Sequence, residues 1–327
     1  MTDISSDNNN IYIIITKSLL IIIIIAFIFI FYQNSHNNKY GLSLEQKIKD
    51  YKSKTFSIIR RTGCPNCGFF SFYIAHLGCI NELLSEGTIP IIDLKSFPNI
   101  YNKGNTNTKN QWELFFYQPY NYTLDEVEKY SDNINYYKCV PKPNSPNENL
   151  IYYNKSLISF WHNFAKSYSP IKNEIMEEAA FIFKKLFENS KNILGVKLKG
   201  TDYISLKPKY RYFQPKTEQI KLDVIEMNIK YKYDFIFLST EDELIKTEFV
   251  QEFGNKLKLL NPNLEKKKLA RNINLKRKIY GDLEFTKNYI LNVIILSKCL
   301  DIITSRCCGA AAIFILTNRF RHIRIYN

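Results

Sequence analysis

The sequence ILGVKLKGTDY (residues 193–203) decides the fold, because an apolar strand runs directly into a polar, charged loop. A helix follows from Pro215 to about residue 230, and proline suits the first turn of a helix. An apolar strand at 234–239 and a helix at 241–253 come next. Short apolar strands that alternate with helices predict parallel strands with both faces covered.

The same alternation extends toward both ends of the chain. Strands are predicted at 56–60 and 88–93, separated by a helix at 69–85. Residues 131–150, rich in Asn, Pro and Ser, predict a long loop. The remaining expected elements are helices at 110–117, 172–189, 286–299 and 309–317, and strands at 256–260, 301–304 and 322–326. We therefore expect an α/β fold built on parallel sheets.

Polar residues follow several of the predicted strands. In parallel sheets of this kind, ligands bind beyond the carboxyl ends of the strands. The positions selected by this rule are Asp93, 199–203, 239–242 and 305–309. We expect a functional site to be built from them.

Composition excludes several classes of protein. The chain has 327 residues, of which 45% are hydrophobic and 15% aromatic, so it has enough apolar side chains to fold. Seven cysteines are too few for a disulfide-stapled miniprotein. The net charge of +14 comes mostly from scattered lysines, which is typical of compositional bias. Because no zinc-finger spacing or leucine-zipper basic region accompanies them, we expect no nucleic-acid partner.

The N-terminal region contains one long apolar segment. Residues 11–32 carry a single charge, at Lys17, and a helix of about 20 apolar residues can cross a bilayer. A cleavable signal peptide is the alternative, but no small-x-small cleavage pattern follows the segment. We therefore predict a tail at 1–10, a transmembrane anchor at 11–32 that binds the membrane, and a spacer at 33–55.

The sequence leaves the membrane orientation open. The positive-inside rule favours a cytoplasmic body, because the segment is followed by Lys39, Lys47, Lys49 and Lys52. The sequons at Asn121 and Asn154 would suit a lumenal body instead. The expected location is a membrane, with a body in the endoplasmic reticulum or Golgi lumen of a eukaryote or at the inner membrane of a bacterium.

Blocks of the predicted body resemble the fucosyltransferase superfamily, which includes α1,6-, α1,2- and protein O-fucosyltransferases. LGVKLKGTDY (194–203) resembles the family's G-V-H-x-R-x-T-D motif. FIFLSTEDELIKTEFVQEFG (235–254) resembles its strand ending in A/S-T-D/E-D, and YILNVIILSKCLDIITSRCCGAAAIFI (289–315) resembles its L-x-x-C-D block. The N-terminal region of O-fucosyltransferase-like proteins is similar to CGFFSFYIAHLG (67–78), IPIIDLKSFPNIYN (89–102) and NQWELFFYQP (110–119). The similarity covers about residues 55–327, in the family's order.

This resemblance implies a GT-B architecture, in which two Rossmann-like domains with parallel sheets enclose a cleft. The acceptor-side domain would comprise residues 56–189, and the donor-binding domain residues 190–327. The resemblance also implies metal-independent, inverting transfer of fucose from GDP-fucose to a hydroxyl of a glycan or protein. The GDP-sugar donor is then a substrate, and neither a cofactor nor a metal is expected.

The resemblance also assigns donor-binding residues. The family arginine that binds the donor's β-phosphate corresponds to Lys199, and the family histidine corresponds to Lys197. Lysine supplies a point charge but not the planar fork of arginine. Nearby cations that could replace the fork are Lys207, Lys209, Arg211 and Arg306. A diphosphate is also stabilised by a helix N-terminus. The other donor-binding candidates are Thr201, Asp202, Thr240, Glu241, Asp242, Ser305 and Gly309, besides Arg306 itself.

The acceptor hydroxyl needs a general base. We predict Asp202 or Asp93 as the catalytic carboxylate, with Glu113 and His76 as further candidates. Ordinary structural roles are the alternative for these positions. Asp202 can form a turn, Glu241-Asp242 can begin a helix, and His76 fits an apolar helix face.

Other functions remain open. The same fold could use another nucleotide sugar, or the lysine at position 199 could mark a non-catalytic glycan-binding protein. Cys64-Pro-Asn-Cys67 is a lone C-x-x-C, which is more typical of a disulfide or two thiols than of zinc. A thiol oxidoreductase is the last alternative. The sequence contains neither a P-loop nor a G-x-G-x-x-G fingerprint.

Overall fold

The structure is a computed structural model. It describes residues 43–102, 108–140, 145–146, 151–199, 215–260 and 283–326. The chain divides into two compact units, residues 1–53 and residues 54–327. In the first unit, helix α2 (Leu44–Lys52) begins with a capping box, in which Ser43 and Gln46 each hydrogen-bond the other's backbone N–H.

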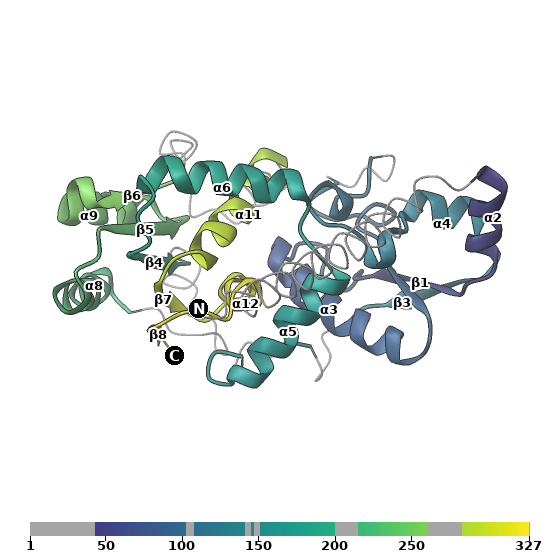
Figure 1. The fold of residues 1–327 in the computed structure, drawn as a ribbon, viewed down its shortest axis with the longest axis horizontal. Helices are drawn as coiled ribbons and strands as arrows, with labels where there is room; N and C mark the ends of the chain where they lie inside the picture. The colour runs from purple at the N-terminus through teal and green to yellow at the C-terminus, as the bar shows by residue number, and fades with distance from the viewer. Residues whose placement is uncertain are drawn as a thin grey trace, which may run out of the picture. The chain divides into compact units, whose positions relative to one another are not determined.

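A three-stranded parallel sheet is formed by the first strands of the second unit (Figure 1). Strand β1 (Phe56–Arg60) lies between β2 (Ile89–Ile92) and β3 (Ile134–Lys138). Helix α3 (Phe69–Ser85) connects β1 to β2 and is buried along most of its length. The segment between β2 and β3 contains two short 3-10 turns and a helix: η1 (Trp112–Leu114), η2 (Pro119–Asn121) and α4 (Leu124–Tyr130).

A five-stranded parallel sheet follows, in the order β6-β5-β4-β7-β8 (Figure 1). Its strands are β4 (Ile193–Leu198), β5 (Phe235–Thr240), β6 (Leu257–Lys258), β7 (Asp301–Ser305) and β8 (Ile323–Tyr326). Its connecting elements are α8 (Thr217–Tyr231), α9 (Glu243–Phe253), η3 (Gly254–Lys256), α11 (Leu283–Ser297) and α12 (Cys308–Leu316). Helices α5 (Lys155–Tyr168) and α6 (Asn173–Phe187) precede β4. The predicted α/β fold with parallel sheets is therefore confirmed.

Side-chain alternation along the strands places the five-stranded sheet between two apolar layers. Leu194 and Val196 of β4 and Ile303 of β7 pack with α8 and α9 on one face. Ile193 and Ile302 belong to the larger core, which includes α3, α11 and α12. Both faces of the sheet are covered, as the apolar strands required.

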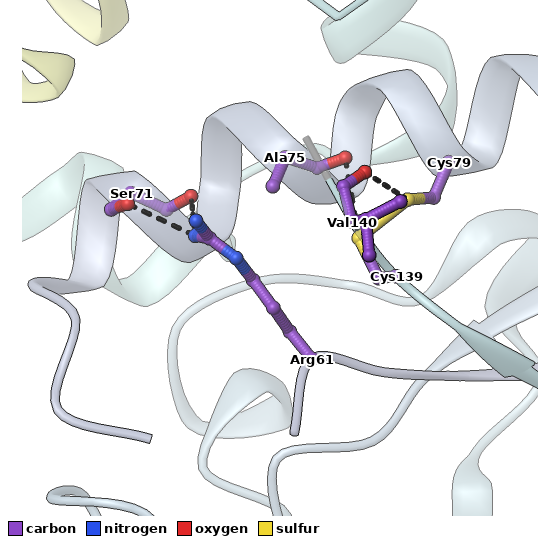
Figure 2. The surroundings of a disulfide bond; sticks show 6 residues. All are labelled: Arg61, Ser71, Ala75, Cys79, Cys139 and Val140. Carbon is purple, nitrogen blue, oxygen red and sulfur yellow. Dashed lines mark hydrogen bonds between the residues drawn. A yellow bond between two sulfur atoms is a disulfide. The ribbon is translucent and has the colours of Figure 1, made fainter. Parts of the chain in front are cut away.

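Two disulfides lie in the first half of the second unit. Cys64 and Cys67 close the turn between β1 and α3. Cys79 in α3 is bonded to Cys139, directly after β3, across a sequence separation of 60 residues (Figure 2). The disulfide reading of Cys64-Pro-Asn-Cys67 agrees with the structure. The cysteines outside the disulfides are Cys299, Cys307 and Cys308.

Side-chain amides hold the loop that follows β2. The Gln118 amide accepts a hydrogen bond from the Ile92 N–H and donates one to the Ile92 carbonyl, both at 2.8 Å. Asn110 donates to the same carbonyl and accepts from the Leu94 N–H. These amides pair with the edge of β2 as a neighbouring strand would, and they fix where the loop leaves the sheet.

The loop predicted at 131–150 is wrong in part, because residues 134–138 form β3. The sequence Ile-Asn-Tyr-Tyr-Lys gives this strand only half-buried or exposed side chains. The strand is stabilised by backbone pairing with β1 rather than by burial of an apolar face. The pairing runs from Phe56 opposite Ile134 to Arg60 opposite Lys138.

The predicted location in a membrane must be corrected. None of the helices in the described residues is long and apolar enough to cross a membrane. The longest of them, α3, has 17 residues, whereas a span needs about 20. The segment predicted as an anchor, residues 11–32, lies outside the described residues. The structure therefore does not support a single-pass anchor.

Candidate functional site

The carboxyl ends of three neighbouring strands bring the predicted site residues together. Strand β4 lies between β5 and β7, with Lys197 in register with Ser239 on one side and Thr304 on the other. The chain winds from β4 through β5 to β6 and then returns to β7 on the opposite side of β4. Ligands of open parallel sheets bind at such a reversal of strand order, which here lies between β4 and β7.

Lys199 and Glu241 form an ion pair at this edge. Their side-chain atoms Nζ and Oε1 are 3.4 Å apart, and the side chains are 20% and 8% exposed. The neighbouring Asp242 is the N-cap of α9, because its carboxylate accepts hydrogen bonds from the Leu244 and Ile245 N–H groups. Asp242 therefore has the role of a helix cap, which was the alternative to donor binding at this position.

Tyr101, from the loop after β2, lies near the same ion pair. Burial raises its pKa, and the charges of Lys199 and Glu241 act on it in opposite directions. Its hydroxyl donates a hydrogen bond to the Cys67 carbonyl at 3.2 Å, and the Ile100 N–H donates to the Pro65 carbonyl. The disulfide-closed turn thus supports the loop that carries Tyr101.

Lys197 is buried in the centre of the sheet, with 1% of its surface exposed. Its ammonium group lies 5.1 Å from the centroid of the Tyr289 ring, close enough for a cation–π interaction. The Tyr289 hydroxyl also occupies the space where a Cβ atom at Gly309 would be. Gly309 therefore lets Tyr289 approach the start of α12.

The first turn of α12 follows β7 directly. Cys307 is the N-cap and accepts a hydrogen bond from the Ala310 N–H through its sulfur. Ser305 is fully buried, and its hydroxyl has no hydrogen-bond partner among the described residues. The Arg306 guanidinium donates to the Tyr153 hydroxyl at 3.4 Å and lies over its ring.

Arg61 is a second arginine of the site, and the sequence analysis missed it. The residue directly follows β1 and is 7% exposed. Its Nη1 donates to the carbonyl and to the hydroxyl of Ser71, in the first turn of α3 (Figure 2). Burial lowers the pKa of Arg61, while electrostatic attraction to the Cys308 sulfur opposes this. Arg61 therefore lies at the first turn of α3, within electrostatic reach of the first turn of α12. The carboxyl-end rule that selected Asp93 after β2 would also have selected Arg61 after β1.

Two of the candidate bases, Asp93 and Glu113, are held by hydrogen bonds, and a third, His76, is buried. Asp93 accepts from Arg60 Nε at 2.6 Å and from the Lys95 and Ser96 N–H groups at 2.8 Å. Glu113 accepts hydrogen bonds from Asn110, Gln118 and the Leu124 backbone. Burial, with a smaller contribution from the Arg61 charge, lowers the pKa of His76 to about 3.

The remaining predicted residues lie outside the described part of the chain. They are Thr201, Asp202, Lys207, Lys209 and Arg211. Within the described residues, no group of three or more His, Cys, Asp or Glu side chains is arranged to hold a metal ion.

Comparisons with known proteins show which solved structures share this fold. No protein-family model matches the chain, and no curated protein matches its sequence. POFUT1 in complex with GDP has a TM-score of 0.51 at 10% identity, with 84% of this chain and 98% of that chain covered. Apo POFUT1 gives 0.50 at 9% identity, with the same coverage. NodZ alpha-1,6-fucosyltransferase soaked with GDP-fucose gives 0.49 at 12% identity, with 81% and 93% covered. The two POFUT1 comparisons show a shared fold, so the resemblance stated from the motifs is confirmed at the level of fold.

Proposed function

We propose that this protein is a glycosyltransferase that transfers fucose from GDP-fucose to a hydroxyl of a glycan or protein. The observation that carries the proposal is the convergence of Lys199, Ser305 and the α12 N-terminus at the carboxyl edge of β4 and β7. The shared fold with POFUT1, which was solved in complex with GDP, supports a nucleotide ligand at this edge. In the proposed GT-B architecture, residues 56–189 form the acceptor side and residues 190–327 bind the donor.

The proposed reaction is a metal-independent inverting displacement. The acceptor oxygen attacks the sugar carbon, its proton passes to a general base, and the bond to the diphosphate breaks. Negative charge grows on the diphosphate as it leaves, so fixed cations and backbone N–H groups stabilise the transition state. Among the predicted bases, Asp202 is the better candidate, because the Asp93 carboxylate is already occupied by Arg60 and two backbone N–H groups.

The donor-binding residues in this proposal have separate roles. Lys199 and the first turn of α12 hold the phosphates, and Thr240 and Glu241 hold donor hydroxyls or the guanine edge. Lys197, Asp242 and Gly309 position these groups, because they pack against Tyr289 or begin a helix. Thr201, Asp202 and Arg306 complete the predicted set.

Calorimetry with the full chain tests the proposal. We expect GDP to bind with a micromolar to low-millimolar dissociation constant, and GDP-fucose to be hydrolysed or transferred without added metal. The absence of any heat of binding at millimolar GDP would refute the donor assignment. Loss of turnover in EDTA, restored by a divalent cation, would refute the metal-independent mechanism.

Two alternatives use the same site. Another nucleotide sugar would appear in a donor panel of GDP- and UDP-sugars as faster turnover than with GDP-fucose. A non-catalytic glycan-binding protein is favoured by the lysine at position 199, whose charge is already partly compensated by Glu241. GDP binding without turnover on any donor or acceptor would select that alternative.

A further inference from the structure

Arg61 carries a buried positive charge without a carboxylate partner in the described part of the chain. Its side chain is 7% exposed, and its hydrogen bonds go to Ser71. The Phe72 ring lies 5.5 Å from the guanidinium carbon. Its neighbour Arg60, by contrast, has Asp93 as a partner at 2.6 Å. Burying a cation without a counter-charge is unfavourable, so the surroundings of Arg61 suit an anionic ligand.

One polar atom of Arg61, its Nε, is buried and has no hydrogen-bond partner among the described residues. The residue is more than nine-tenths buried. Both hydrogen bonds to Ser71 come from Nη1 of Arg61. The opposite edge of the guanidinium, formed by Nε and Nη2, takes no part in them. This edge has the planar, two-donor shape that matches two oxygens of a phosphate.

Arg61 lies at the N-terminus of α3, where it donates a hydrogen bond to Ser71 in the first turn. Its charge is also attracted to the Cys308 sulfur, in the first turn of α12. A separate contact joins the same two turns, because the rings of Phe70 and Tyr289 lie 5.2 Å apart and Tyr289 packs on Gly309.

Neither of these helices has an acidic residue in its first turn, and the N-cap Gly68 of α3 provides no side-chain cap. At α12 the Cys307 sulfur already accepts from the Ala310 N–H, so the α3 N-terminus is the one without a side-chain cap. The partial positive charges of both helix starts favour an anion beside them.

We propose that Arg61 and the first turns of α3 and α12 bind the diphosphate of the nucleotide-sugar donor. Arg61 then supplies the planar cation that the motif position Lys199 lacks. This inference rests on the proposed function, because the donor it names is the donor of that reaction. Lys199 keeps a secondary role, since Glu241 already compensates part of its charge.

The test is calorimetry on the full chain with GDP, guanosine and inorganic pyrophosphate. Arg61→Gln should weaken GDP and pyrophosphate binding at least tenfold and leave guanosine binding within twofold. Arg61→Lys keeps the charge without the fork, so it should weaken GDP about three- to tenfold. The matched control is Arg60→Lys, the same change at the adjacent arginine, which should leave GDP affinity within twofold.

The outcomes separate this inference from the proposed function. If the wild type binds GDP and the Arg61 variants bind it equally well, the Arg61 assignment is overturned and the proposed function stands. An equal loss of guanosine binding in Arg61→Lys would make the effect structural and would also overturn it. If the wild type binds pyrophosphate but not GDP, and Arg61→Lys weakens pyrophosphate, the anion site stands and the guanine donor fails. Binding of neither ligand overturns both.

Discussion

The Lys199 ammonium group lies 3.4 Å from the Glu241 carboxylate, so the loops that follow β4 and β5 are joined by an ion pair. Glu241 is the more buried partner, with 8% of its side chain exposed. A cation held in this way is positioned for a ligand, but part of its charge is already compensated. The consequence is a moderate, measurable contribution of Lys199 to anion binding.

Lys199→Ala should weaken GDP binding by about three- to tenfold, which corresponds to roughly 0.7–1.4 kcal/mol. The physical reason is the loss of one partly compensated positive charge near the phosphates. Calorimetry with GDP measures the change, and Lys298→Ala, at an exposed lysine beyond α11, is the matched control. Unchanged affinity in Lys199→Ala would remove this residue from the donor site.

Gly309→Ala should destabilise the protein by about 1–3 kcal/mol, because the new Cβ would overlap the Tyr289 hydroxyl. Removing that hydroxyl in the double variant Gly309→Ala/Tyr289→Phe should restore most of the loss. Urea unfolding measures both effects. Gly63→Ala is the control, since a Cβ at Gly63 meets no atom within 4 Å. A double variant no more stable than Gly309→Ala would contradict the packing explanation.

Asp301→Asn should lower the free energy of unfolding by about 1–3 kcal/mol, because it removes the charge of a fully buried carboxylate that accepts several hydrogen bonds. Asp301 is fully buried and accepts hydrogen bonds from Tyr233, from Arg321 at 2.7 Å and from the His322 N–H. Burial alone would raise the pKa of Asp301, but the bonds from Arg321 and Tyr233 outweigh it and lower the pKa. The stabilisation is therefore present at neutral pH and is lost as pH falls.

Denaturant titration at pH 7 measures the effect of Asp301→Asn. The control is Asp234→Asn, at an exposed carboxylate hydrogen-bonded to Ser190, which should change stability by less than about 0.5 kcal/mol. Equal stability of the two variants would show that the buried network around Asp301 contributes little.

His76 should make the fold sensitive to acid. Burial, followed by the Arg61 charge, lowers the pKa of His76 to about 3, whereas an unfolded histidine titrates near 6.5. Below about pH 6.5 the unfolded chain binds a proton that the folded chain does not. The free energy of unfolding should then fall by about 1.4 kcal/mol per pH unit from this residue.

His76→Leu keeps an apolar side chain at this site and removes the titration. Its unfolding free energy should change less between pH 6.5 and 4.5 than that of the wild type, by about 2–3 kcal/mol. Parallel pH profiles for the two proteins would contradict the neutral, buried state of His76.

The two disulfides should contribute unequally to stability. A disulfide stabilises mainly by restricting the unfolded chain, and the effect grows with the length of the closed loop. Cys79–Cys139, the disulfide in Figure 2, closes a separation of 60 residues. Cys64–Cys67 closes one of 3. Cys79→Ala/Cys139→Ala should therefore cost about 4 kcal/mol, and Cys64→Ala/Cys67→Ala about 2 kcal/mol. The reverse order in thermal unfolding would contradict the loop-length argument.

Most of the fold could be predicted from the sequence. Apolar runs such as Ile193–Leu198 and Phe235–Thr240 identified the buried parallel strands, because such strands need apolar residues on both faces. Strand β3 was missed, since its side chains are largely exposed and its stability comes from backbone pairing with β1. The division of the body at residue 190 stays a prediction.

The part of the candidate site that could be predicted consists of residues at the carboxyl ends of neighbouring parallel strands. Lys199, Glu241 and Ser305 follow adjacent parallel strands, so the carboxyl-end rule brings them together. Arg61 gains its significance from burial against α3 and from its approach to Cys308, more than 200 residues later in the chain. The carboxyl-end rule applied to β1 would have selected Arg61 as a position, but a single sequence contains no local signal for its burial or its partners.

The distribution of the cysteines has a consequence for biosynthesis. Both disulfides are complete by Cys139, and the first of the other cysteines, Cys299, follows roughly 160 residues later. At a ribosomal rate of about 5–20 residues per second, this gives roughly 8–30 s before a competing thiol emerges. In an oxidising environment the correct pairs can close while the rest of the chain is still being made. The order of cysteines thus keeps the four paired cysteines from mispairing with the three later ones during synthesis.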